Sequence, residues 1–196
     1  MNIKDIKIYL VDINNTMCKA WEYYFDKYEN VKIINSALED FLDNNNVRAI
    51  VSPANAYGLM DGNYDYAITK YYGEGLMKRI QKVIIEDYYG EQPIGTALTV
   101  EINDSQLLIH TPAMQYPSHI KDTRIIYHCM RSTLIEAIDN RVNSIVIPAW
   151  GGQCGGVSCM EIASMMQRAY NQLLNTPSEI NWDYAKKNSF NPMEFW

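Results

Sequence analysis

The chain has 196 residues, of which 47% are hydrophobic and 20% are charged, and its net charge at pH 7 is -6. This length favours one domain with short additions over two full domains, and the composition argues against disorder and collagen-like repeats. The excess of acidic residues, with no long basic run, argues against sequence-independent binding along a nucleic-acid backbone. A small anionic ligand stays compatible with this charge, because backbone N–H groups can bind phosphate without Lys or Arg.

Targeting, disulfide and metal motifs are not evident in the sequence. The first fifteen residues hold no apolar stretch long enough for a signal peptide, and no later run is long enough to span a membrane. The cysteines lack CxxC spacing, and neither they nor the three histidines show the spacing of zinc ligands. We therefore expect a reduced, cytoplasmic protein without a metal or another cofactor. The cysteines are Cys18, Cys129, Cys154 and Cys159.

Strand and helix patterns alternate along the first half of the chain. Apolar runs predict strands over 7–12, 31–34 and 48–51. Apolar residues at helical spacing predict helices over 15–28, about 38–42, 64–72 and 74–89. Gly73 and Gly90 follow the last two, as expected at the end of a helix.

The second half continues the alternation. Two predicted strands, 96–102 and 107–110, are separated by a hairpin turn at 103–105. The patterns that follow predict a long helix over 122–141, a fully apolar strand over 144–148 and a helix over 160–174. Ser158 and Glu161 form a Ser-x-x-Glu capping box before that last helix. Such alternation predicts an α/β fold with a parallel or mixed sheet covered by helices on both faces.

The pattern ends at Asn175, and the remaining segment is rich in aromatic residues. We expect this segment, 175–196, to dock on an apolar part of the domain, since an ordered terminus needs an anchor. The alternative is a tail that binds a partner. Its large aromatic residues are Trp182, Tyr184, Phe190, Phe195 and Trp196.

The loop after the third predicted strand is the first candidate for a binding site, because open α/β sheets bind ligands beyond the carboxyl ends of their strands. Asn55 offers one acceptor and two donors, which suits the vicinal hydroxyls of a ribose. Gly62 and Asn63 are residue types that readily take a positive φ beside a ligand. Asp65 stands at the start of the next helix, where a carboxylate is favoured. A simple turn with a helix cap would explain the same residues.

The loop after the last strand is the second candidate. Four glycines, 151, 152, 155 and 156, lie between an apolar strand and a capped helix, where consecutive N–H groups can bind phosphate. The loop has neither the Gly-Lys-Ser/Thr ending of a P-loop nor the G-x-G-x-x-G spacing of a dinucleotide fingerprint. Cys154, inside this loop, has no histidine tied to it in sequence, so we expect a ligand-facing side chain rather than a nucleophile.

Taken together, four segments resemble the macro domain, a module that binds ADP-ribose. Residues 49–55 (AIVSPAN) resemble the signature strand of the family, and residues 60–65 (MDGNYD) resemble its ribose loop. Residues 108–112 (LIHTP) are similar to its central strand, and residues 148–156 are similar to its diphosphate loop. The resemblance is to a branch with Ser-Pro-Ala-Asn and Met-Asp-Gly, and it covers residues 31–174.

The resemblance implies a three-layer α/β/α fold with a central mixed sheet. It divides the chain into a domain over 1–174, with a core over 31–174 and an N-terminal strand-helix extension over 1–30, and the tail. It implies that ADP-ribose, free or linked to protein, binds between the 55–65 and 150–156 loops. The expected ligand-binding residues are Ser36, Asn55, Gly62, Asn63, Asp65, Trp150, Gly151, Gly152, Gln153, Cys154 and Gly155.

Two alternatives to simple binding stay open. In hydrolytic members the position of Asp65 orients or activates water at the distal ribose, so the resemblance also implies a hydrolase that removes ADP-ribose from proteins or cleaves ADP-ribose 1″-phosphate, with Asp65 and Asn55 as catalytic residues. The other alternative is an interaction module that uses the tail. The aspartate with which the family reads adenine is missing after the second strand, where Ser36 stands; Ser36 or Asp12 is the expected substitute.

Overall fold

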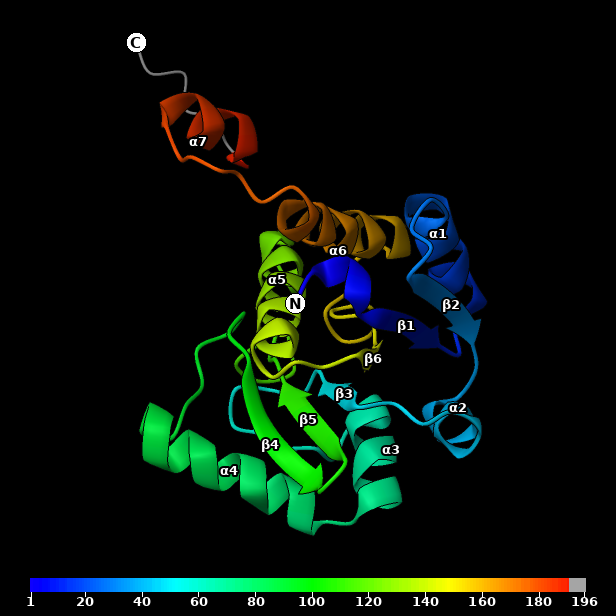
Figure 1. Ribbon diagram of the computed structural model, residues 1–196. Helices are drawn as coiled ribbons and strands as arrows, with labels where there is room; N and C mark the ends of the chain where they lie inside the picture. The colour runs from blue at the N-terminus through cyan, green and yellow to red at the C-terminus, as the bar shows by residue number, and fades with distance from the viewer. Residues whose placement is uncertain (191–196) are drawn as a thin grey trace.

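The computed structural model describes residues 1–190, which form one mixed sheet with helices on both faces (Figure 1). The six strands of this part of the chain run in the order β2-β1-β6-β3-β5-β4. All neighbours pair in parallel except β4 and β5, which form the predicted hairpin. The strands are β1 (Lys7–Asp12), β2 (Val31–Asn35), β3 (Ala49–Ser52), β4 (Leu98–Asn103), β5 (Gln106–His110) and β6 (Ser144–Ile147).

The helices form the two outer layers. Helix α6 contacts α1 and α5 on one face of the sheet, whereas α3 contacts α2 and α4 on the other face (Figure 1). Buried strands are apolar on both faces: Ile145 and Ile147 of β6 pack into the first layer, and Val146 between them packs into the second. The helices are α1 (Asn15–Phe25), α2 (Leu38–Asn44), α3 (Asn63–Tyr72), α4 (Gly75–Tyr88), α5 (Arg124–Asp139), α6 (Cys159–Leu174) and α7 (Trp182–Asn188), preceded by a 3-10 turn (Ile3–Asp5).

The expected three-layer α/β/α fold with a mixed sheet is confirmed. The predicted N-terminal strand-helix extension, residues 1–30, contributes to the sheet and to one helix layer. Strand β1 lies inside the sheet, between β2 and β6, and α1 packs against α6. The sequence could not reveal this because a strand pattern does not specify its neighbours. Among residues 1–190, no helix is both long and apolar enough to cross a membrane.

The predicted capping box before α6 forms only in part. The Ser158 hydroxyl accepts the N–H of Glu161, as expected. The Glu161 carboxylate instead accepts a hydrogen bond of 2.7 Å from the hydroxyl of Thr123, which precedes α5. A contact between the two helix starts therefore replaces the reciprocal half of the capping box.

The segment after α6 includes a short helix that the sequence did not predict. Helix α7 stands apart from the sheet in Figure 1, and Trp182 is 77% exposed. Arg168 of α6 lies over the ring of Phe190, 3.8 Å from its centroid, and donates to the carbonyls of Asn188 and Ser189. Phe195 and Trp196 lie outside the described residues, so docking of the whole tail stays a prediction, as does its partner-binding alternative.

Candidate functional site

A cavity of about 710 Å³ opens where four neighbouring parallel strands end. Its walls include a residue at or just beyond the carboxyl end of each strand: Asp12 at the end of β1, Ser36 after β2, Pro53 after β3 and Pro148 after β6. This is the edge of an open α/β sheet where ligands bind, because the connecting loops diverge there. The volume is in the range of small-molecule sites.

The helices that follow these strands begin at the same cavity. The wall includes Asn14, Ala37, Gly62 and Cys159, which lie at the starts of α1, α2, α3 and α6. Each helix start carries unpaired N–H groups and a partial positive charge. At α2 and α3 no side chain caps these groups. The cavity is therefore surrounded by peptide dipoles that favour an anion.

Side-chain charges in the cavity have the opposite sign. Asp12, Glu39, Asp61 and Asp65 line it, and none of the described lining residues is Lys, Arg or His. The carboxylates are not arranged for a cation either, because among residues 1–190 no three His, Cys, Asp or Glu side chains gather as metal ligands. An anionic ligand in this cavity has to be held by neutral donors, chiefly backbone N–H groups.

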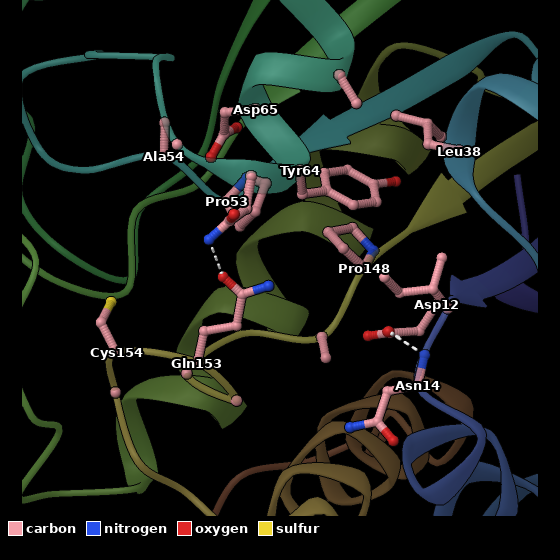
Figure 2. Close-up of a pocket in the computed structure, with 18 of the residues that line it drawn as sticks. Asp12, Asn14, Leu38, Pro53, Ala54, Tyr64, Asp65, Pro148, Gln153 and Cys154 are labelled. Atoms are coloured by element: carbon pink, nitrogen blue, oxygen red, sulfur yellow. Dashed lines mark hydrogen bonds between the residues drawn. The ribbon is translucent and has the colours of Figure 1, made fainter.

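Asp65 lies in the first turn of α3, as expected, and its carboxylate is buried in the cavity wall (Figure 2). The hydroxyl of Ser52 donates a hydrogen bond of 2.6 Å to it. Burial nevertheless raises the pKa of Asp65 to about 7, although the hydrogen bonds from Ser52 and from the Ala54 N–H act in the opposite direction. Such a carboxyl group exchanges a proton near neutral pH, as a general acid or base must.

Asn55 lines the cavity, but its side chain also closes its own loop. The amide oxygen accepts the N–H groups of Tyr57 (3.1 Å) and Leu59 (3.3 Å). The amide nitrogen donates to the carbonyl of Leu59 at 3.2 Å. An Asn side chain has two donor hydrogens, so one stays available to a ligand. Asn55 thus has a structural role that the sequence did not predict.

Part of the loop between β6 and α6 leaves its backbone N–H groups without an acceptor in the described residues 1–190. Among the hydrogen bonds of residues 1–190, none is donated by the backbone N–H groups of residues 151–155. Three of the carbonyls are used instead: those of Gly151, Gln153 and Gly155 accept N–H groups within the loop or from Ile120, each at 3.0 Å. Consecutive unpaired N–H groups at a helix start are a phosphate-binding arrangement.

Two of the glycines in this loop are required by its geometry. Gly151 has a φ of +79°, a region that L side chains rarely adopt. A Cβ atom on Gly155 would lie 2.5 Å from the carbonyl oxygen of Gly151. A larger residue at either position would displace the loop.

The loop between β3 and α3 differs from the prediction at Gly62 and makes one contact that the sequence did not predict. Asn63 has the expected positive φ of +37°, but Gly62 has a φ of -107° and open space around its Cβ position. Its absent side chain therefore leaves room at the cavity rather than permitting a turn. The amide nitrogen of Asn63 donates to the side-chain oxygen of Gln153, the bond drawn as a dashed line at Gln153 in Figure 2. This contact joins the two predicted loops across the cavity.

Asp12 and Ser36, the two expected substitutes for the adenine-reading aspartate of the family, lie together at one end of the cavity. Ser36 lines this end and donates to the carbonyl of Ala37 at 3.0 Å. Burial raises the pKa of Asp12, whose carboxylate accepts the N–H of Asn14 at 2.8 Å. The hydroxyl of Tyr64 is buried nearby without a hydrogen-bond partner in the described part of the chain.

The structure brings ten of the eleven predicted ligand-binding residues to this one cavity. Trp150 is the exception. Its side chain is buried in the core and its indole N–H donates to the carbonyl of Thr111 at 3.0 Å. Cys154 is exposed at the wall, where its sulfur lies 3.6 Å from that of Met114.

The sequence profile of the Macro domain family matches residues 51–166, more than half of the chain. The chain belongs to the Macro domain family. A comparison with curated proteins by sequence finds no significant match. Several solved macrodomains share the fold.

Three of these structures give the extent of the likeness. The Oceanobacillus iheyensis macrodomain with ADP has a TM-score of 0.58 and 24% identity, over 66% of this chain and 71% of that one. The macrodomain of Mycobacterium tuberculosis DarG has a TM-score of 0.57 and 17% identity, over 66% and 84%. The Trypanosoma brucei macrodomain in complex with ADP has a TM-score of 0.56 and 19% identity, over 67% and 53%.

Sequence reasoning missed several residues of the Macro domain cavity. Asn14 and Met17 line it from the start of α1, and Met114 and Pro117 line it from the loop after β5. Asn14 could have been found, because it follows the carboxyl end of a predicted strand. The other three carry no local signal, since apolar residues at a cavity wall look like core residues in a sequence.

Proposed function

We propose that this Macro domain protein binds ADP-ribose or an ADP-ribose derivative, free or linked to a protein. The observation that carries the proposal is the row of unpaired N–H groups at residues 151–155, placed in the same cavity as two polar ends. An elongated nucleotide sugar has this order of groups: a base, a diphosphate and a second ribose. ADP in two of the similar macrodomain structures supports the same ligand class.

In this proposal the diphosphate lies against the N–H groups of residues 151–155 and the start of α6. The distal ribose lies beside Asn55 and Asp65, and the adenine lies at the end formed by Asp12 and Ser36. Asp12 is the stronger candidate for the amino group of adenine, because its carboxylate can only accept hydrogen bonds when ionised. The Ser36 hydroxyl already donates to a neighbouring carbonyl.

Calorimetric titration with ADP-ribose tests the proposal, with AMP and ribose 5-phosphate as partial ligands. ADP-ribose should bind more tightly than either fragment, because only the complete ligand reaches both ends of the cavity. The proposal would be refuted if millimolar ADP-ribose produced no binding heat and no shift in the unfolding temperature.

A second candidate function is hydrolysis at the distal ribose, and the position of Asp65 favours it. With a pKa of about 7, Asp65 can take a proton from water as the water oxygen bonds to the anomeric carbon and the bond to the leaving group breaks. The leaving group is then the oxygen of a protein side chain or of the 1″-phosphate. A cytoplasmic location stays a prediction that accompanies either function.

Hydrolysis is tested with ADP-ribosylated protein and with ADP-ribose 1″-phosphate. The Asp65→Asn variant keeps the shape of the side chain but cannot accept the proton, so its rate should fall by about a hundredfold or more. An unchanged rate in the variant would exclude Asp65 from the mechanism. Absence of turnover in the wild type, with binding intact, would leave a binding module.

A further inference from the structure

The mouth of the cavity at the Asn55 end is bordered by exposed apolar side chains. Tyr57 is 37% exposed, Leu59 45% and Tyr116 62%. Leu59 also lines the cavity, as does Pro117, the neighbour of Tyr116. The cavity wall is therefore continuous with an exposed surface, which we call the aromatic rim: Tyr57, Leu59, Glu91, Gln115 and Tyr116.

The aromatic rim is built from three loops that backbone hydrogen bonds hold together. The N–H of Ala56 donates to the carbonyls of Met114 (3.1 Å) and Gln115 (3.3 Å). The N–H of Gln92 donates to the carbonyl of Ala56 at 3.0 Å. Segments that are far apart in sequence thus form one ordered surface beside the cavity.

Glu91 is the charged residue at the centre of this surface. Its carboxylate accepts hydrogen bonds from the hydroxyl of Tyr57 (3.4 Å) and from the side-chain amide of Gln115 (2.8 Å). No Lys or Arg of residues 1–190 pairs with it; the ion pairs in this part of the chain are Lys82–Glu86 and Arg124–Asp122. The rim therefore presents a carboxylate among aromatic rings without a cation of its own.

This chemistry fits a positively charged side chain from another molecule. Arg and Lys bind carboxylates through charge-assisted hydrogen bonds, and their cationic groups are attracted to the faces of aromatic rings. Exposed apolar surface with a polar group at its centre is typical of protein interaction sites. A free nucleotide sugar would have no cation to place here.

We propose that the aromatic rim binds a basic segment of the polypeptide that carries the ADP-ribose. This inference rests on the proposed function. The rim adjoins the cavity end that holds Asn55 and Cys154, where the sulfur of Cys154 contacts Met114. In the proposed orientation the distal ribose lies at that end, so a polypeptide attached to it leaves the cavity across the rim. The substrate class is then protein ADP-ribosylated next to Arg or Lys.

Short peptides with a hydrolysis-resistant, triazole-linked ADP-ribose at the centre test the inference. Three peptides differ only in the flanking residues, which are Arg and Lys, Gly and Ser, or Glu. Their dissociation constants are measured by calorimetry beside that of free ADP-ribose. The basic peptide should bind about tenfold more tightly than the neutral one, because two or three such contacts together supply about 1.4 kcal/mol. The acidic peptide should bind most weakly.

Variants then assign the preference to the rim. Glu91→Gln and Tyr116→Ala should each reduce the advantage of the basic peptide to about twofold, and should leave the affinity for free ADP-ribose unchanged. Glu179→Gln removes the same charge from an exposed position after α6 and should leave the advantage intact. Unfolding temperatures of the variants establish that each is folded.

The outcomes separate this inference from the proposed function. Equal affinities for the three peptides, with free ADP-ribose bound, would overturn the basic-segment proposal and leave ADP-ribose binding in place. A preference that persists in both rim variants would also overturn it. Failure of free ADP-ribose and of all peptides to bind would refute the proposed function and this inference with it.

Discussion

Replacing Asp65 by Asn should make the folded protein more stable at pH 8, and the gain should shrink as the pH falls. The pKa of Asp65 is about 7 in the folded protein, against an ordinary value of 3.8. The folded state therefore binds the proton more tightly than the unfolded state does. Between these two pH values the wild type loses stability as the pH rises, because the unfolded chain releases the Asp65 proton while burial keeps the folded carboxyl group protonated. The Asn variant has no such carboxyl group.

The size of the effect follows from the difference in pKa. Each pKa unit corresponds to about 1.4 kcal/mol, so ionised Asp65 destabilises the fold by about 4 kcal/mol at pH 8. Of this, about 2–3 kcal/mol develops between pH 5 and pH 8. The Asn amide group loses about 1–2 kcal/mol if its N–H finds no acceptor. That loss is independent of pH, so the change in the difference between the two proteins is the quantity to measure.

Urea unfolding of both proteins at several pH values between 5 and 8 measures this quantity. Other groups cancel in the comparison: burial lowers the pKa of His110 to about 3, but His110 is the same in both proteins. The variant should gain about 2–3 kcal/mol relative to the wild type over this range. Stability curves that run parallel would refute the assignment of a raised pKa to Asp65.

Three further predictions concern ligand binding. Asn63→Ala and Gln153→Ala should each increase the dissociation rate of ADP-ribose by about threefold to tenfold, because each variant loses the same hydrogen bond of about 1 kcal/mol. The double variant should therefore dissociate little faster than either single variant. Additive effects in stopped-flow measurements would contradict this. Gly155→Ala should weaken ADP-ribose binding at least tenfold in calorimetry because its Cβ atom collides with Gly151, whereas Gly75→Ala, where a Cβ atom meets nothing within 4 Å, should bind as the wild type does. The dissociation constant of ADP-ribose should change by less than about threefold between 50 and 500 mM NaCl, because no Lys or Arg is among the described lining residues; a tenfold weakening would indicate cationic side chains in the site.

The sequence predicted the fold because its strands and helices have strong local signals. The strand over 144–148 is apolar throughout, and it lies inside the sheet as β6. The position of β1 could not be predicted, since pairing between distant segments depends on the whole sheet. Helix α7 was missed because it buries none of its residues, so its sequence shows no apolar face.

The location of the cavity could be predicted from the sequence, because it follows from the positions of two loops. The side-chain contacts within the cavity could not. Two glycine-bearing loops at strand ends predicted the cavity, because the topology of α/β sheets places such ends together. The double use of Asn55, the Asn63–Gln153 bridge and the raised pKa of Asp65 could not be predicted. Each depends on atoms that come together only in the folded chain, and burial in particular has no counterpart in a local sequence pattern.

The net charge of the chain and the proposed ligand look incompatible until the source of positive potential is considered. An acidic protein binds a diphosphate poorly through side chains when the nearest ones are Asp12, Glu39, Asp61 and Asp65. Four helix starts and the N–H groups of residues 151–155 supply the attraction instead. Such binding depends on backbone geometry, so it constrains few side chains: chiefly the glycines whose Cβ atoms would collide. The loop between β6 and α6 therefore depends on its glycines more than on any side chain for this attraction.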